Sequence, residues 1–161
     1  MSTLKFLEYA LVISCVCALA WCICRPADAL AEGRRRAHLK SDRFLDDEAF
    51  LAAIRAVESS GNPRAVGPHG ELGAYQFKAS TWHQHTSAPH IWAQSPQFAD
   101  KIARAHLAWL QEQVIERNRV PDVFTLALAW RYGPAFEAAQ GSLCHYQRRV
   151  LAIYNEERKR K

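Results

Sequence analysis

Residues 53–81 read AIRAVESSGNPRAVGPHGELGAYQFKAST, and the character of this stretch changes in its middle. An apolar helical pattern that includes Val57 ends where Ser60 and Gly61 stop a helix. Glu58 lies at that boundary, between an expected dry core and an open cleft. We expect the pKa of a glutamate in this position to be raised enough for it to hold a proton near neutral pH.

The segment that follows Glu58 is a glycine-rich loop of closely spaced turn signals. Its turn residues are Gly61, Asn62, Pro63, Gly67, Pro68, Gly70 and Gly73. A loop with so many turn residues is either a linker or one wall of a binding site. The aromatic pair Tyr75 and Phe77 at its end favours the binding site. A small hairpin in this loop is the one place where we expect strand pairing.

The rest of the folded part has helical periodicity, which predicts a mainly α fold. Asp46 and Asp47 supply a cap and a negatively charged first turn for the helix that ends near Glu58. The expected helices cover residues 46–60, 78–85, 96–117 and 121–132, then a short helix up to residue 141 and a last amphipathic helix with Leu143, Tyr146, Val150, Ile153 and Tyr154.

Two of these helices are expected to supply most of the core. The pattern over residues 96–117 places Phe98 and Ala105 on its broad apolar face. The helix over residues 121–132, which includes Phe124, is apolar nearly all round. A helix of that kind is usually central and buried, so we expect the other helices to surround it.

The N-terminal residues have the features of an export signal. Lys5 precedes an apolar run over residues 9–24, and Ala29-Leu30-Ala31 offers a small-residue cleavage site. The run of about 16 residues is shorter than the ~20 that span a bilayer comfortably, so cleavage and anchoring both stay open. We expect a signal peptide or signal anchor (1–31), a charged linker (32–45) and one folded domain (46–161). The protein is expected to be exported to the periplasm or cell envelope. There it would be either free or attached to the inner membrane through residues 9–24.

Composition narrows the class of partner. The chain has a formal net charge of +5 and is 49% hydrophobic, which suits a globular rather than a disordered protein. The basic runs lie at the two ends, without zinc spacing or an RNP-like sequence, so an anionic wall polymer or lipid is a better partner than nucleic acid. Cys144 is interpreted as a core residue. We expect a monomer that has no metal and no cofactor.

Four short elements, in order and at intact spacing, resemble the soluble lytic transglycosylases, a family of lysozyme-like enzymes. Glu58-Ser59 with Asn62-Pro63 is similar to the family's catalytic Glu-Ser and its Asn-Pro turn. Gly73-x-x-Gln76 is similar to its Gly-Leu-Met-Gln element, and Tyr146-x-x-x-Val150 to its closing helix. Residues 129–134, AWRYGP, resemble its Ala-Tyr-Asn-Ala-Gly-Pro segment. The resemblance implies a lysozyme-like helical domain with an active-site groove.

The resemblance also implies a reaction on peptidoglycan in which one glutamate acts twice. Glu58 would protonate the glycosidic oxygen between N-acetylmuramic acid (MurNAc) and N-acetylglucosamine (GlcNAc), then accept the proton of the muramyl 6-hydroxyl as a 1,6-anhydro ring closes. Ser59 and Gln76 would orient the substrate or the loop. The remaining residues expected at the substrate site are aromatic: Tyr75, Trp130, Tyr132 and Tyr146. Of the first three, which offer faces for sugar rings, two are also candidates for the core.

Two alternatives to this function stay open. Ordinary glycoside hydrolases use two carboxylates about 5 to 9.5 Å apart, and Glu71 in the loop is the nearby candidate for the second one. The chain would then be a hydrolytic muramidase. A module that binds glycan or an envelope partner without turnover is the other alternative, because Trp130 and Arg131 depart from the family pattern. Trp130 replaces a tyrosine expected to bond the glutamate, and the cation of Arg131 would lower the pKa of Glu58.

Overall fold

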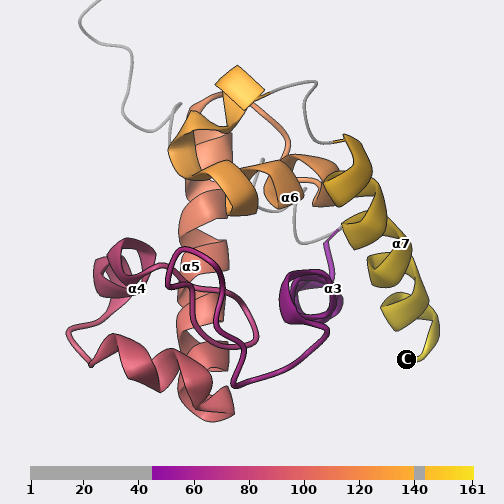
Figure 1. Cartoon of the computed structure of the whole chain (residues 1–161). Helices are drawn as coiled ribbons and strands as arrows, with labels where there is room; N and C mark the ends of the chain where they lie inside the picture. Colours follow the sequence, from indigo (N-terminus) through magenta and orange to yellow (C-terminus); the bar gives the residue numbers. More distant parts are fainter. Residues whose placement is uncertain (1–44, 140–143) are drawn as a thin grey trace, which may run out of the picture. The chain divides into compact units, whose positions relative to one another are not determined.

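A computed structural model describes residues 45–139 and 144–161, and the expected signal segment and nearly all of the charged linker lie outside these residues, as does the side chain of Cys144. The described part is mainly helical, as predicted (Figure 1). Its elements are α3 (Asp47–Ser59), α4 (Ala79–His85), the 3-10 helix η1 (His90–Gln94), α5 (Pro96–Glu116), α6 (Val123–Tyr132), the 3-10 helix η2 (Gly133–Ala139) and α7 (Cys144–Lys159).

Helix α3 is the element that carries Glu58, and local sequence signals set where it begins. Asp46 is the N-cap, and its side chain accepts a hydrogen bond from the Ala49 N–H at 3.0 Å, as predicted. Phe50 and Ile54, on one face of this helix, are fully buried. Helix α3 therefore starts at a cap and is held in place by one apolar side.

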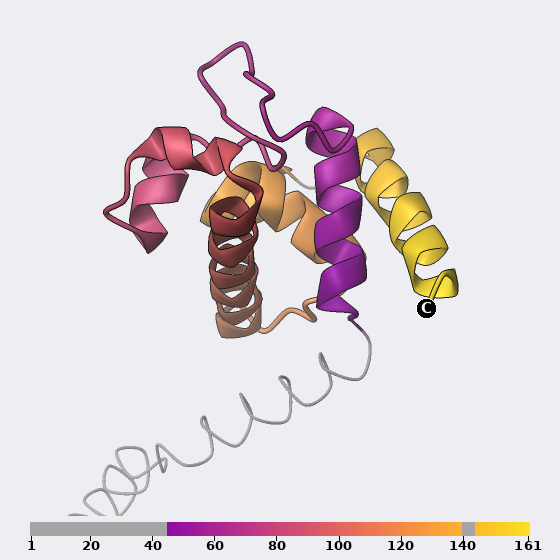
Figure 2. The ribbon, with the colours of Figure 1, turned by 90° about the horizontal axis from the view of Figure 1, so that it is seen from below.

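Helix α3 lies between α5 and α7, and the two views agree on this order (Figures 1 and 2). It packs most extensively against α7, while α6 packs against both α5 and α7. Residues 126–129 of α6 are buried, which confirms that this helix is central. The last turn of α3 faces Arg131 of α6 and Tyr146 of α7.

Three predicted core positions are wrong. Phe98 and Phe124 are 43% and 40% exposed, and Ala105 is also exposed. Phe98 lies in the first turn of α5, where its ring contacts that of the exposed Trp92 with centroids 4.6 Å apart. A periodic apolar pattern identifies a face but not the turns at which that face extends beyond its neighbours.

Two polar side chains of α5 are buried where the pattern predicted only apolar ones. His106 lies within 3.0 Å of the His85 ring nitrogen, and Gln111 donates to Asp47 at 3.0 Å. Burial lowers the pKa of His106 to about 3, so its ring is neutral at physiological pH. Each buried polar group thus has a partner, which removes most of the cost of burying it.

The glycine-rich loop folds back on itself through isolated bridges. Val66 pairs with Leu72 and Leu72 with Phe77, but no strand forms among the described residues, so the expected hairpin is reduced to these contacts. Gly73 has a φ of 77°, and a Cβ atom there would collide with the backbone carbonyl of Ala93. Only glycine allows the loop to approach η1 this closely.

Among the helices of residues 45–139 and 144–161, none is both long and apolar enough to cross a bilayer. The attachment predicted through residues 9–24 falls outside these residues.

Candidate active site

Glu58 occupies the last turn of α3, and the chain turns away sharply just after it. Ser60 is left-handed with a φ of 55°, and Gly61 follows with a φ of 77°. The N–H of Ser60 donates to Ala56, and the N–H of Gly61 donates to Arg55. The helix therefore ends where the sequence predicted. The side chain of Glu58 is only 8% exposed.

The two carboxylate oxygens of Glu58 have different partners from two other helices. The Tyr146 hydroxyl of α7 donates to Oε1 at 2.7 Å. Arg131 of α6 places Nη1 at 3.6 Å from Oε2, beyond hydrogen-bond range but close enough for an ion pair. The guanidinium of Arg131 also lies over the Tyr146 ring, 5.8 Å from its centroid. These three side chains form the centre of the candidate site.

Burial raises the pKa of Glu58 above its ordinary value, and this is the largest effect on it. The hydrogen bond from Tyr146 and the charge of Arg131 act in the opposite direction, while the charge of Glu71 adds to the increase. The net direction agrees with the predicted increase, and protonation near neutral pH stays a prediction. Burial and the neighbouring carboxylate also raise the pKa of Tyr146, so this phenol remains a hydrogen-bond donor.

Ser59 and Gln76 bond to the backbone around Glu58. The Ser59 hydroxyl donates to Ala74 O at 2.8 Å, which fastens the end of α3 to the loop. Gln76 has a left-handed φ of 51°, and its Nε2 donates to Gly73 O at 2.8 Å. Both side chains therefore shape the loop, and their contacts with substrate stay predictions.

The family of this chain follows from its sequence match. The family model of the transglycosylase SLT domain matches residues 37–143, well over half of the chain. The chain belongs to this family. Comparison with curated proteins and with solved structures gives no match. Family membership makes this a transglycosylase-type enzyme domain directed at peptidoglycan. Tyr146 lies beyond the matched residues, although its hydroxyl bonds the candidate catalytic carboxylate.

The three aromatic residues proposed as sugar platforms have different environments in this SLT domain. Tyr75 is 2% exposed, and Trp130 packs in the core against a ring cluster of Phe50, Tyr75, Phe77 and His106. Tyr132, in contrast, is 41% exposed. Two of the three are therefore core residues, and Tyr132 is the one with an open surface. The family tyrosine that Trp130 replaces is expected to bond the glutamate, and in this chain Tyr146 donates a hydrogen bond to Glu58 from α7.

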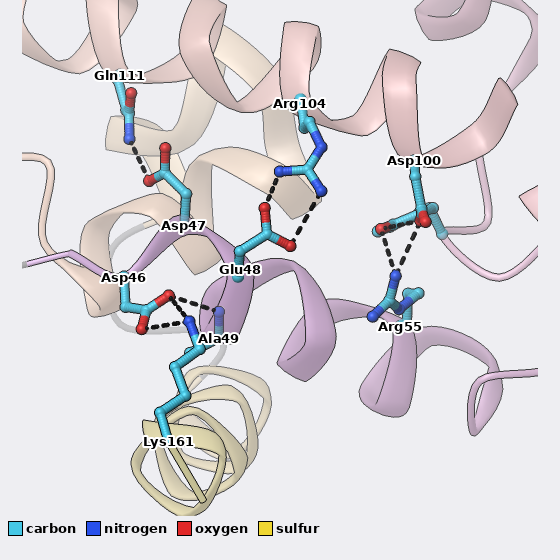
Figure 3. Close-up of polar contacts among 10 residues, drawn as sticks. Asp46, Asp47, Glu48, Ala49, Arg55, Asp100, Arg104, Gln111 and Lys161 are labelled. Atoms are coloured by element: carbon cyan, nitrogen blue, oxygen red, sulfur yellow. Dashed lines mark hydrogen bonds and ion pairs between the residues drawn. The ribbon is translucent and has the colours of Figure 1, made fainter. Parts of the chain in front are cut away.

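Sequence reasoning missed a polar cluster on the α5 side of α3. Arg55, one turn before Glu58, pairs with Asp100 of α5 at 2.9 Å (Figure 3). The Tyr75 hydroxyl donates to the same oxygen at 2.6 Å. These residues line a cavity of about 210 Å³ between α3, the loop, η1 and α5. Glu58 does not line this cavity, so the groove expected around Glu58 stays a prediction. The separation of Arg55 and Asp100 in sequence explains why no local pattern revealed the cluster.

Glu71, the candidate second carboxylate of the SLT domain, lies in the loop. Its Oε2 accepts from the His69 N–H at 2.9 Å, and a Cβ atom on Gly67 would meet both this oxygen and Oε1 of Gln76. Backbone hydrogen bonds hold the pKa of Glu71 below its usual range. Glu71 is therefore ionised at neutral pH and acts on Glu58 through its charge.

Proposed function

We propose that this SLT domain is a lytic transglycosylase that cleaves the glycosidic bond between MurNAc and GlcNAc and leaves a 1,6-anhydro-MurNAc end. Glu58 is the catalytic acid and then the catalytic base. The observation that carries the proposal is the buried Glu58 carboxyl, with its raised pKa, held by the Tyr146 hydroxyl at the end of α3. A general acid needs a pKa near the working pH, and burial shifts the pKa of Glu58 in that direction.

The reaction returns Glu58 to its starting state. Protonated Glu58 gives its proton to the glycosidic oxygen, and the bond from that oxygen to the muramyl C1 breaks. The muramyl 6-hydroxyl then attacks C1, and the ionised Glu58 accepts its proton. The hydrogen bond from Tyr146 orients the carboxyl and stabilises the ionised intermediate state. One carboxylate therefore completes both proton transfers without a water molecule.

The substrate contacts of the proposal come from residues around this carboxyl. We assign Tyr132, which is exposed, as the aromatic contact for a sugar ring. Ser59 and Gln76 set the shape of the adjoining loop and offer polar groups to the glycan. Tyr75 and Trp130 support the site from the core. The expected location, the periplasm or cell envelope with or without an inner-membrane anchor at residues 9–24, is part of the proposal.

A second candidate function is hydrolysis, which gives reducing ends. Its support is the charge of Glu71, which contributes to the raised pKa of Glu58. A purely glycan-binding role has weaker support, because Arg131, the partner of Glu58, is 54% exposed and the pKa of Glu58 is raised in spite of its charge.

Digestion of purified peptidoglycan followed by mass spectrometry distinguishes these functions. Anhydro-muramyl ends are expected from the wild-type chain, and reducing ends would instead establish hydrolysis. Intact glycan that still binds the protein would establish the non-catalytic role. Glu58→Gln should strongly reduce either kind of cleavage while it leaves the fold intact, whereas Glu71→Gln should abolish hydrolysis and leave transglycosylation in place.

A further inference from the structure

Arg131 is a charged side chain of the candidate site that the proposed reaction does not use. It extends from the last turn of α6, and 54% of its side chain is exposed, whereas only 8% of Glu58 is. The pair therefore joins a buried carboxyl to a solvent-facing cation. An exposed cation of this kind is accessible to a ligand that approaches Glu58.

The ion pair leaves most of the hydrogen-bonding capacity of Arg131 unused. A guanidinium has five N–H donors and binds a carboxylate best through two parallel hydrogen bonds. The distance of 3.6 Å between Nη1 and Glu58 Oε2 lies outside hydrogen-bond range. The ring of Tyr146 supports the guanidinium from one side, at 5.8 Å. Arg131 is thus held in place by its neighbours and is free to form two short bonds with another carboxylate.

The substrate class supplies such a carboxylate. A muramyl residue carries a lactyl group whose carboxyl is free in glycan without stem peptides, and the stem peptides themselves carry carboxylates. The lactyl group projects from the same sugar ring whose C1 reacts at Glu58. A cation beside Glu58 therefore lies within reach of an anionic substituent of the substrate.

We propose that Arg131 is a specificity-determining residue that binds a carboxylate of the muramyl unit and exchanges Glu58 for it when substrate binds. This inference rests on the proposed function, because it takes peptidoglycan as the substrate and Glu58 as the acid. In the free protein Arg131 pairs with Glu58, and in the complex it pairs with the substrate.

The exchange of partners by Arg131 also changes the pKa of Glu58. The groups that act on Glu58 are Arg131 from α6, Tyr146 from α7 and Glu71 from the loop. When Arg131 turns to the substrate, its lowering effect on the Glu58 pKa weakens, and the bound sugar excludes further water. Glu58 therefore becomes easier to protonate when a carboxylate-bearing substrate is in place. Arg131 in this way links substrate recognition to the protonation of the acid.

Binding to the inactive full-length Glu58→Gln chain tests the proposal without turnover. The probes are GlcNAc-MurNAc tetrasaccharides with free lactyl carboxylates, with these groups converted to primary amides, and with stem peptides attached. Calorimetric titration should show that the amide binds about fivefold more weakly than the acid, the scale of an exposed ion pair. Arg131→Gln should bring the acid and the amide to equal affinity, and Arg131→Lys should retain part of the difference.

Arg119→Gln is the matched control, because Arg119 is exposed and its substitution removes the same charge without touching the site. If dependence on Arg131 is confined to the stem-peptide probe, the bound carboxylate belongs to the peptide. Equal affinities of the Glu58→Gln chain for all probes would overturn the inference. That result would leave the proposed function intact, because cleavage by the wild-type chain and its loss in Glu58→Gln are measured separately.

Discussion

The two ends of α3 carry carboxylates in opposite electrostatic situations. At the N-terminal end, Asp46 accepts from the Ala49 N–H and from Lys161, Asp47 accepts from Gln111, and Glu48 pairs with Arg104 through both oxygens (Figure 3). These groups lie at the positive end of the helix dipole, which favours negative charge. The hydrogen bond from Lys161 holds the pKa of Asp46 below its usual range.

At the C-terminal end, Glu58 lies where the dipole opposes negative charge, and it is nearly removed from solvent. Its pKa is raised, and the partners that it has do not fully compensate for burial. The same helix thus uses acidic side chains for stability at one end and tolerates an unfavourable one at the other. An unfavourable charge that persists in a folded protein is a sign of function.

Glu58→Gln is the strongest test of this contrast. Cleavage should fall by about 10²- to 10⁴-fold, the usual contribution of a general acid and base. The stability of the folded protein at neutral pH should increase. Because the folded-state pKa of Glu58 is raised, the ionised carboxyl costs stability as pH rises through that pKa, and below the unfolded value the cost vanishes. The variant should therefore have a higher Tm than the wild type at pH 7 and an equal Tm at a pH below the ordinary glutamate pKa of about 4.3. A lower Tm at pH 7 would contradict the burial argument.

Tyr146→Phe tests the partner from α7. The change removes the hydrogen bond to Oε1 and keeps the ring under Arg131, so kcat should fall about tenfold, as expected for a bond to a charged group. Because this bond favours the ionised carboxyl, its loss should raise the pKa of Glu58 and shift the pH-rate profile upward. A profile that stays in place, measured by release of anhydro-muropeptides across pH, would show that Tyr146 has only a packing role.

Asp46→Ala tests the other end of α3. Loss of the N-cap should lower the free energy of unfolding by about 1 kcal/mol, while activity at low temperature should be unchanged. Asp46→Asn is the control, because the amide oxygen still caps Ala49 while the charge that pairs with Lys161 is lost. Urea denaturation measures both. If the two variants lose equal stability, the ion pair, and not the cap, is the main contribution.

Glu48→Gln should have the smallest effect. The pair with Arg104 is more than half exposed on both sides, so its loss should cost at most about 0.5 kcal/mol. Raising the salt concentration should reduce that difference further, because salt screens exposed charges. A loss above 1 kcal/mol in the same urea measurement would mean that this pair does more than an ordinary surface ion pair.

The helices were predictable because their ends are fixed by local signals. Asp46 and Asp122 cap α3 and α6 through their own side chains, Pro96 begins α5, and Gly133 ends α6. Each signal acts within a few residues, so it can be read from the sequence alone. Glu58 was also predictable, since it lies where an apolar helical face meets a glycine-rich loop.

The partners of Glu58 were less predictable because they come from distant parts of the chain. Tyr146 is 88 positions away, and its bond to Glu58 depends on how α7 packs against α3. The closeness of Arg131 was anticipated from the resemblance, but its exposure was not, since a side chain's exposure depends on what its neighbours leave open. For the same reason the exposed positions of Phe98 and Phe124 could not be deduced from periodicity.

The contact of Gly73 with the carbonyl of Ala93 limits how the sequence of this region can change. Any side chain at position 73 would force the loop away from η1. Ser59 is bonded to Ala74, so that displacement would extend to the turn that holds Glu58. The end of α3 that carries Glu58 thus depends on a residue with no side chain at all, and even alanine should be excluded there during evolution of the domain.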